Sequence, residues 1–77
     1  MIKAINTEYQ SQVEEAFELL VILNDFDNRR TNAEAQDDHV SYKVYDKQCE
    51  RVFNDYLEAI EDLPKDEIDN IDETLYS

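Results

Sequence analysis

Residues 42–63, YKVYDKQCERVFNDYLEAIEDL, decide the fold class of this chain. Apolar and aromatic residues recur there at alternating spacings of three and four, which is the pattern of one buried stripe along an α-helix. We therefore predict a helix over about residues 38–62, with a looser start from Thr31, where Thr-Asn-Ala-Glu matches a capping box. The stripe consists of Tyr42, Tyr45, Cys49, Val52, Tyr56, Ala59 and Leu63.

A short strand is the alternative for the beginning of this segment. Residues 40–45 also alternate with the period of two that is typical of a half-buried strand. Only residues 1–5 offer a partner for such a strand, and an isolated two-stranded ribbon is marginal in water. An α+β fold with a strand near 40–45 therefore stays open beside the helical interpretation.

A second helical stripe lies upstream, in residues 9–23, YQSQVEEAFELLVIL. The helix is predicted to start at Thr7, because Thr-Glu-Tyr-Gln fits a capping box, although Asn6 competes for the cap position. We expect it to end in residues 24–28, Asn-Asp-Phe-Asp-Asn, because Asn and Asp tolerate turn conformations in a chain without glycine. The stripe consists of Tyr9, Val13, Ala16, Leu20 and Leu23.

Pro64 separates these segments from a third apolar repeat. Proline lacks an N–H and ends or kinks a helix, so we expect the second helix to stop there. Ile68, Ile71 and Leu75 then recur at spacings of three and four, which predicts a short helix over residues 65–75. The expected fold is all-α, a single small helical domain over residues 1–77, built as an antiparallel helical hairpin plus a short C-terminal third helix.

The apolar run at residues 19–23 is wider than a two-helix contact requires. Five consecutive apolar residues cover more than one face of a helix. Either the third helix shelters the second face, or the run forms an interface with a partner or with another copy in a homodimer.

The composition limits the class of protein. Leu, Ile, Val and Phe number 20 of 77 residues, above the ~20% below which a highly charged chain stays disordered. The single cysteine, Cys49, excludes an intramolecular disulfide, and no signal-peptide pattern opens the sequence, so we expect a cytoplasmic protein. No apolar run is long enough to span a bilayer.

The sequence carries no catalytic or cofactor motif. EF-hand spacing fails from Asp25 and again from Asp62, and one His with one Cys cannot form a tetrahedral zinc site. His39 and Cys49 are ten residues apart on one predicted helix, ~15 Å along its axis, too far to pair. We expect neither enzymatic activity nor a cofactor or metal, and we interpret Cys49 as a packed thiol.

Charge is the strongest functional signal. The net charge is −13, divided into −5 over residues 1–28, zero over residues 29–51 and −8 over residues 52–77. Residues 58–73 hold eight acids and one base; as a helix of ~24 Å they carry about one net charge per 3.4 Å, similar to one strand of duplex DNA. Direct binding to nucleic acid or to an anionic membrane is therefore disfavoured.

In size and in the acidic segment 58–73, the chain resembles the DNA-mimic class of small phage or mobile-element proteins, which inhibit restriction, CRISPR or other DNA-handling machinery. The resemblance implies a function, occupation of the positively charged site of a nucleic-acid-binding protein, and assigns no individual residue. The charge pattern itself supplies the candidate partner-binding residues. These are Glu14, Glu18, Asp25, Asp27, Glu58, Glu61, Asp62, Asp66, Glu67, Asp69, Asp72 and Glu73.

Two other interpretations of the acids stay open. Acidic residues on solvent faces are typical of solubility alone. Alternatively, the chain is an acidic protein–protein interaction module, antitoxin-like or an adaptor, in which apolar contacts supply the affinity and charge only steers the encounter.

Overall fold

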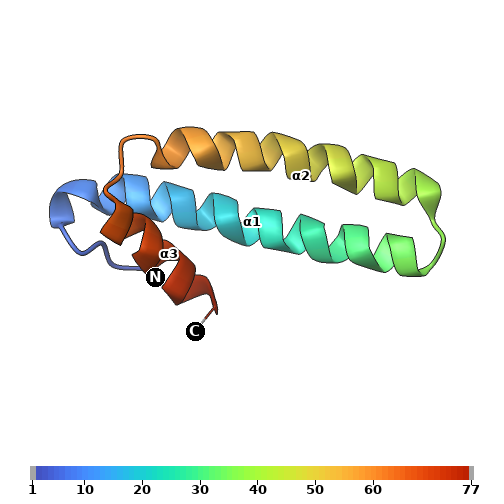
Figure 1. Cartoon of the computed structure of the whole chain (residues 1–77), viewed down its shortest axis with the longest axis horizontal. Helices are drawn as coiled ribbons and strands as arrows, with labels where there is room; N and C mark the ends of the chain where they lie inside the picture. Colours follow the sequence, from blue (N-terminus) through green and yellow to red (C-terminus); the bar gives the residue numbers. More distant parts are fainter. Residues whose placement is uncertain (1, 77) are drawn as a thin grey trace.

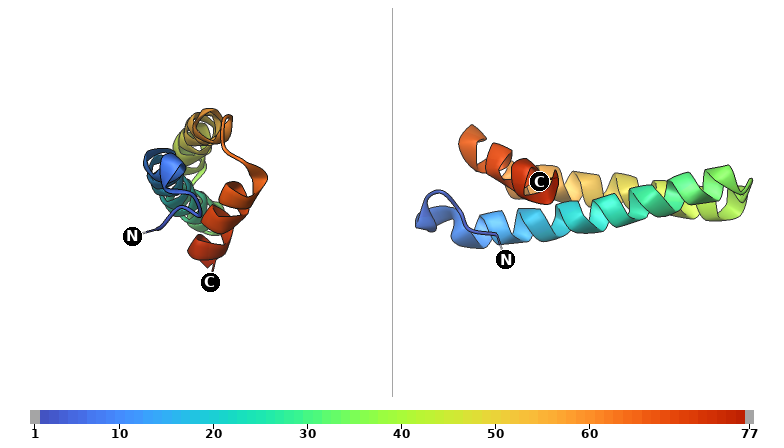
Figure 2. Two further views of the ribbon diagram at one scale, coloured as in Figure 1. Left: turned by 90° about the vertical axis from the view of Figure 1, so that its left-hand side faces the viewer. Right: turned by 90° about the horizontal axis from the view of Figure 1, so that it is seen from below.

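The computed structural model describes residues 2–76, which form three helices and one short 3₁₀ turn (Figure 1). Helix α1 spans Gln10–Ala35, α2 spans His39–Ile60 and α3 spans Lys65–Tyr76, while the 3₁₀ turn is Thr7–Tyr9. Helices α1 and α2 lie antiparallel, and α3 crosses one end of this hairpin (Figures 1 and 2). The all-α prediction is confirmed. The strand proposed for residues 40–45 is wrong, because α2 includes that segment and no strand occurs within residues 2–76.

The two predicted apolar stripes form the core of the hairpin. Leu20 of α1 is buried, as are Val52 and Tyr56 of α2. A spacing of three and four on both helices lets their side chains interdigitate along a shallow crossing, so the contact continues along the hairpin. Cys49 is also buried in the α2 stripe, and its surroundings raise the pKa of its thiol, mainly by desolvation, as expected for a packed cysteine.

The N-terminal cap differs from the prediction. Asn6, and not Thr7, caps the first turn: its side-chain oxygen accepts a hydrogen bond of 3.0 Å from the Glu8 N–H. Gln10 also departs from the capping-box role, since its amide binds the extended N-terminal segment, accepting from the Ala4 N–H at 2.8 Å and donating to the Ile2 carbonyl at 2.9 Å. Thr7 lies inside the 3₁₀ turn.

The predicted break at residues 24–28 is wrong, because α1 continues through it to Ala35. Pairs that require helical spacing span this segment: Arg29 contacts Asp25 at 3.0 Å and Arg30 contacts Asp27 at 2.6 Å. The looser start of the second helix at Thr31 is wrong for the same reason. Thr31 lies inside α1, and its hydroxyl donates to the Asp27 carbonyl at 3.0 Å.

The chain reverses instead at residues 36–38. Asp37 adopts the left-handed conformation, with φ of 55°. Its N–H bonds to the Glu34 carbonyl at 3.2 Å, and the Asp38 N–H bonds to the Ala33 carbonyl at 2.9 Å, which is the pairing of a Schellman C-cap. Asp38 then caps α2 by accepting from the Ser41 N–H at 3.1 Å. An aspartate thus occupies the position that is usually glycine.

Helix α3 follows Pro64 as predicted and packs mainly against α1. Its fully buried Ile71 joins Ile2 and Leu63 in the core cluster, so the extended N-terminal segment, the α2–α3 connection and α3 close the same end of the hairpin (Figure 2). The molecule is elongated, with extents of 45 × 24 × 17 Å.

Candidate functional site

A shallow groove between α1 and α2 collects carboxylates from both helices. It encloses about 380 Å³ and is lined by Gln12, Glu15 and Leu19 of α1 and by Asp55, Glu58, Ala59 and Asp62 near the end of α2. All four of its carboxylate side chains are exposed, and none of the lining residues is basic. We call this surface the acidic groove.

Helical spacing explains why these carboxylates gather. Asp55 and Glu58 are three residues apart, so they lie on one side of α2, and Asp62 follows in the turn just after the helix ends at Ile60. Glu15 faces them from α1, whose axis lies ~8–10 Å away in packed helices. The candidates Glu58 and Asp62 are therefore brought together. Glu15 and Asp55 were not among the candidates, although the same spacing in the sequence could have identified Asp55.

The other candidates of α3 and the preceding connection are exposed but do not line the groove. They lie at the same end of the molecule, and Asp66, in the first turn of α3, is placed where a negative charge stabilises the exposed N–H groups of a helix. These residues are Glu61, Asp66, Asp69, Asp72 and Glu73.

Glu67 is the exception, and its assignment to the partner-binding surface is corrected. Its side chain is 1% exposed. One carboxylate oxygen accepts from the Ile5 N–H at 2.7 Å and the other from the Asn6 N–H at 3.2 Å. Glu67 thus fastens the N-terminal segment to α3, and Asn70 adds a bond of 2.8 Å to the Lys3 carbonyl. A partner could not reach this carboxylate without displacing the segment.

Candidates on α1 divide between the two ends of the hairpin. Glu14 is half-buried and accepts from the Gln10 amide at 2.9 Å, whereas Glu18 is exposed. Asp25 and Asp27 lie toward the interhelical turn, where each forms an ion pair with an arginine. Their charges are locally balanced, so these two residues do not extend the acidic groove.

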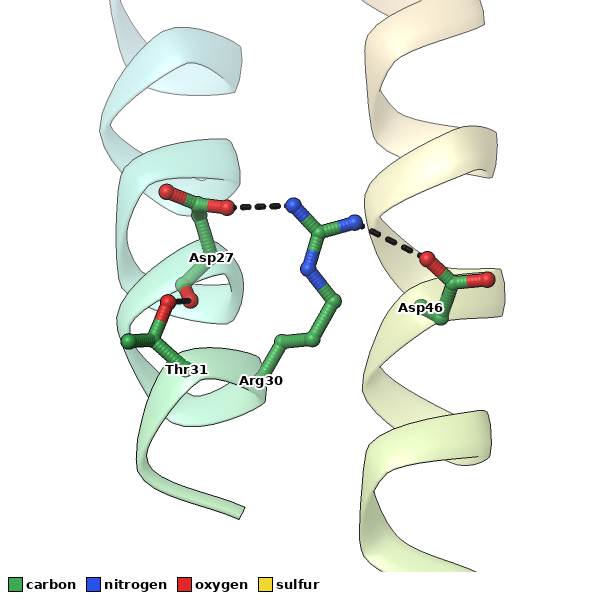
Figure 3. Close-up of polar contacts among 4 residues, drawn as sticks. All are labelled: Asp27, Arg30, Thr31 and Asp46. Carbon is green, nitrogen blue, oxygen red and sulfur yellow. Dashed lines mark hydrogen bonds and ion pairs between the residues drawn. The ribbon is translucent and has the colours of Figure 1, made fainter. Parts of the chain in front are cut away.

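Arg30 pairs with acidic residues of both helices (Figure 3). Its guanidinium contacts Asp27 at 2.6 Å within α1 and Asp46 of α2 at 2.9 Å, so it links the two helices. Hydrogen bonds to Asp46 and then Asp27 raise the pKa of Arg30 further above its ordinary value. Sequence reasoning missed this link because Arg30 and Asp46 are 16 residues apart.

The folded hairpin consequently separates charge along its length. We define the acidic end as residues 2–23 and 52–76, which hold thirteen acids and two lysines, a net charge of −11. The loop end, residues 24–51, holds seven acids and five bases, a net charge of −2. The two acidic regions of the sequence become one region of the molecule because the hairpin is antiparallel.

A second, less polar groove opens along α1 and α2 beside the last turn of α3. It encloses about 660 Å³, and we call it the apolar groove. Part of the run at residues 19–23 contributes to it, since Leu20 and Leu23 lie in its lining. Its apolar lining consists of Leu20, Leu23, Cys49, Phe53, Leu57 and Tyr76.

Comparison with protein-family models, curated proteins and solved structures gave no match for this chain. Among residues 2–76, no group of three or more His, Cys, Asp or Glu side chains is arranged to hold a metal ion. In the same part of the chain, none of the helices combines the length and the apolar character needed to cross a bilayer.

Proposed function

We propose that this protein is a DNA-mimic inhibitor, which occupies the positively charged nucleic-acid-binding site of another protein through its acidic end. The observation that carries the proposal is the acidic groove, where four exposed carboxylates from α1, from α2 and from the turn after α2 lie together with no base among the lining residues. Lys and Arg side chains that bind phosphates also bind carboxylates, Arg often through both oxygens at once.

The spacing of the carboxylates supports mimicry of a nucleic acid. Along α2, Asp55 and Glu58 are offset by ~4.5 Å of helix rise, which is of the same order as the ~3.4 Å between charges on one DNA strand. Asp55 and Glu58 on α2 and Glu15 on α1 belong to packed helices, so these charges are held in place rather than carried on a flexible tail.

The remaining acids of the acidic end extend this surface. Glu61 directly follows the end of α2, and Asp69, Asp72 and Glu73 lie on α3, all of them exposed. Because only two lysines occur at the acidic end, its net charge of −11 attracts a basic site over several ångströms at physiological ionic strength.

The test is a capture experiment with two charge-matched variants. The immobilised protein is incubated with a nuclease-treated bacterial lysate, and bound proteins are eluted with a short DNA duplex and quantified by mass spectrometry. The groove variant combines Glu15→Gln, Glu58→Gln and Asp62→Asn. The control combines Asp25→Asn, Glu34→Gln and Asp37→Asn at the loop end, outside both grooves, so each variant carries three fewer negative charges than the natural chain and has a net charge of −10.

We expect the duplex to release a basic nucleic-acid-binding protein, and the groove variant to capture it roughly tenfold less well, because each lost carboxylate removes one contact to a cation. The loop-end control should capture it as the natural chain does. A captured protein that DNA does not displace, or an equal loss in both variants, would contradict the mimic proposal.

A further inference from the structure

The apolar groove lies along α1 and α2, beside the part of the hairpin that α3 leaves uncovered. At ~1.5 Å per residue, the 26 residues of α1 span ~39 Å, whereas the 12 residues of α3 span only ~18 Å. Helix α3 crosses the end of the hairpin near the chain termini and leaves the rest of it uncovered (Figures 1 and 2). The stretch of α1 that lines the groove, from Leu20 to Arg30, spans ~15 Å, about three helical turns.

Large apolar side chains are exposed along this uncovered stretch. Phe53 and Leu57, one turn apart on α2, are 42% and 46% exposed, and Tyr76, at the end of α3, is 71% exposed. With the more deeply placed Leu20 and Leu23 of α1, they line one continuous groove. A monomer gains nothing from leaving such side chains in water, so a contiguous group of them marks a binding surface.

The polar lining of the apolar groove determines the charge of its occupant. The groove lining contains one base, Arg30, and three acids, Asp27, Asp46 and Glu50, so its net charge is −2. Arg30 is the one basic residue in the lining, and it is already paired with Asp27 and Asp46. The charge of Glu50 is therefore not balanced by a base within the groove lining. An occupant with basic residues beside its apolar face would complement this lining.

We propose that the apolar groove binds an amphipathic basic α-helix of a partner protein, with its apolar residues against Phe53 and Leu57 and its Lys or Arg residues toward Glu50. Anchors at positions i, i+3, i+4 and i+7 would follow the groove, as in other helix-in-groove complexes. A second copy of this chain is a poorer occupant, because it brings a further charge of −13 to a surface that is itself negative.

This proposal does not depend on the DNA-mimic function. The apolar groove and the acidic groove share no lining residue, so either surface can bind its partner without the other.

The probe for the test is a fluorescently labelled peptide of ~14 residues, made of Leu and Lys in the i, i+3, i+4, i+7 pattern. A peptide of the same composition in scrambled order controls for attraction to the net charge. The groove variant combines Phe53→Gln and Leu57→Gln. The matched control combines Val40→Gln and Val44→Gln, two exposed residues of the same helix that do not line the groove.

We expect the patterned peptide to bind at physiological ionic strength, and the groove variant to bind it at least ~10-fold more weakly than the Val40/Val44 control, as measured by fluorescence anisotropy. Circular dichroism establishes that both variants fold. Equal binding by the two variants, or equal binding of the scrambled peptide, would overturn the proposal. Sedimentation of the natural chain as a dimer that the groove variant dissociates would assign the groove to a second copy and would overturn it as well.

Discussion

Glu67 binds the N-terminal segment to α3, a role that its position in an acidic stretch of sequence does not predict. The surrounding residues of α3 suggest one more surface charge, yet its carboxylate is buried and accepts two backbone hydrogen bonds from Ile5 and Asn6. Those donors lie 61 and 62 residues away, and no local pattern relates positions so far apart. The assignment of this residue therefore required the folded chain.

Replacing Glu67 should lower stability more than replacing any exposed acid of α3. In Glu67→Gln, one oxygen becomes an NH₂ group that faces a backbone N–H, so a buried donor loses its acceptor, which typically costs about 1–3 kcal/mol in the free energy of unfolding. Glu73→Gln, an exposed neutralisation on the same helix, is the control and should change stability little. Urea unfolding followed by circular dichroism measures both, and equal effects would show that Glu67 acts only through its charge.

At the scale of the elements, the apolar stripes predicted the helices well and the connections less well. Spacing of three and four located the buried sides of α1 and α2, because the side-chain periodicity of a helix is fixed by its geometry. The break at residues 24–28 was predicted from the turn preference of Asn and Asp, which amounts to a few tenths of a kcal/mol per residue. Packing of the Phe26 ring against Tyr45 of α2, at a centroid distance of 6.3 Å, and the Arg30 link to Asp46 outweigh that preference.

The true reversal at residues 36–38 lacks the usual signal of a glycine. Asp37 takes the left-handed conformation just after Gln36, the C-cap of α1, and the adjacent Asp38 is the N-cap of α2. In the sequence this pair is indistinguishable from the Asn and Asp residues at 24–28, which stay helical. The acidic groove was only partly predictable: the shared side of Asp55 and Glu58 on α2 follows from spacing, but Glu15 joins them only through the register of the hairpin.

Continuity of α1 can be tested at Asn28, an exposed residue at the end of the predicted break. In a helix interior, alanine is favoured over glycine by about 1 kcal/mol, whereas a turn shows no such preference or the reverse. We therefore expect Asn28→Ala to be more stable than Asn28→Gly by about 1 kcal/mol in the free energy of unfolding. A glycine variant as stable as the alanine variant would place a break in α1.

The N-cap of α2 predicts a pH dependence. Hydrogen bonds from the side chain and the backbone of Ser41 lower the pKa of Asp38 from its ordinary value of 3.8. A pKa that is lower in the folded than in the unfolded chain means that ionised Asp38 favours folding above pH 3.8, and that this contribution is lost as the pH falls through the lower, folded value. Asp38→Asn keeps a capping oxygen without titrating.

We expect the stability of the natural chain relative to Asp38→Asn to decrease when the pH is lowered from neutral to below 3.8. Urea unfolding of both chains at each pH measures this difference, in which the titration of the other carboxylates cancels. A difference that is constant with pH would mean that Asp38 contributes nothing through its charge.

At the scale of the whole molecule, like charges at the acidic end oppose folding. A net charge of −11 lies on residues 2–23 and 52–76, and repulsion among these groups is largely unscreened at 0.01 M salt, where the Debye length is ~30 Å. At 0.15 M it falls to ~8 Å, so the free energy of unfolding should rise with NaCl concentration.

Neutralising Glu15, Glu58 and Asp62 should therefore stabilise the chain at low salt, and this gain should shrink as salt is added. The loop-end control with the same net charge should gain less, because its acids lie among five bases. Thermal unfolding at two NaCl concentrations measures both effects. A gain that is independent of salt would attribute the stabilisation to helix propensity instead of charge.

The uneven charge along a molecule 45 Å long also makes it an electric dipole. A positively charged surface exerts a torque on such an object before the two touch, and turns its long axis so that the chain termini and α3 lead while the turn at residues 36–38 trails. Encounters with a basic protein would then begin from a narrow range of orientations, which shortens the rotational search that ordinarily slows association.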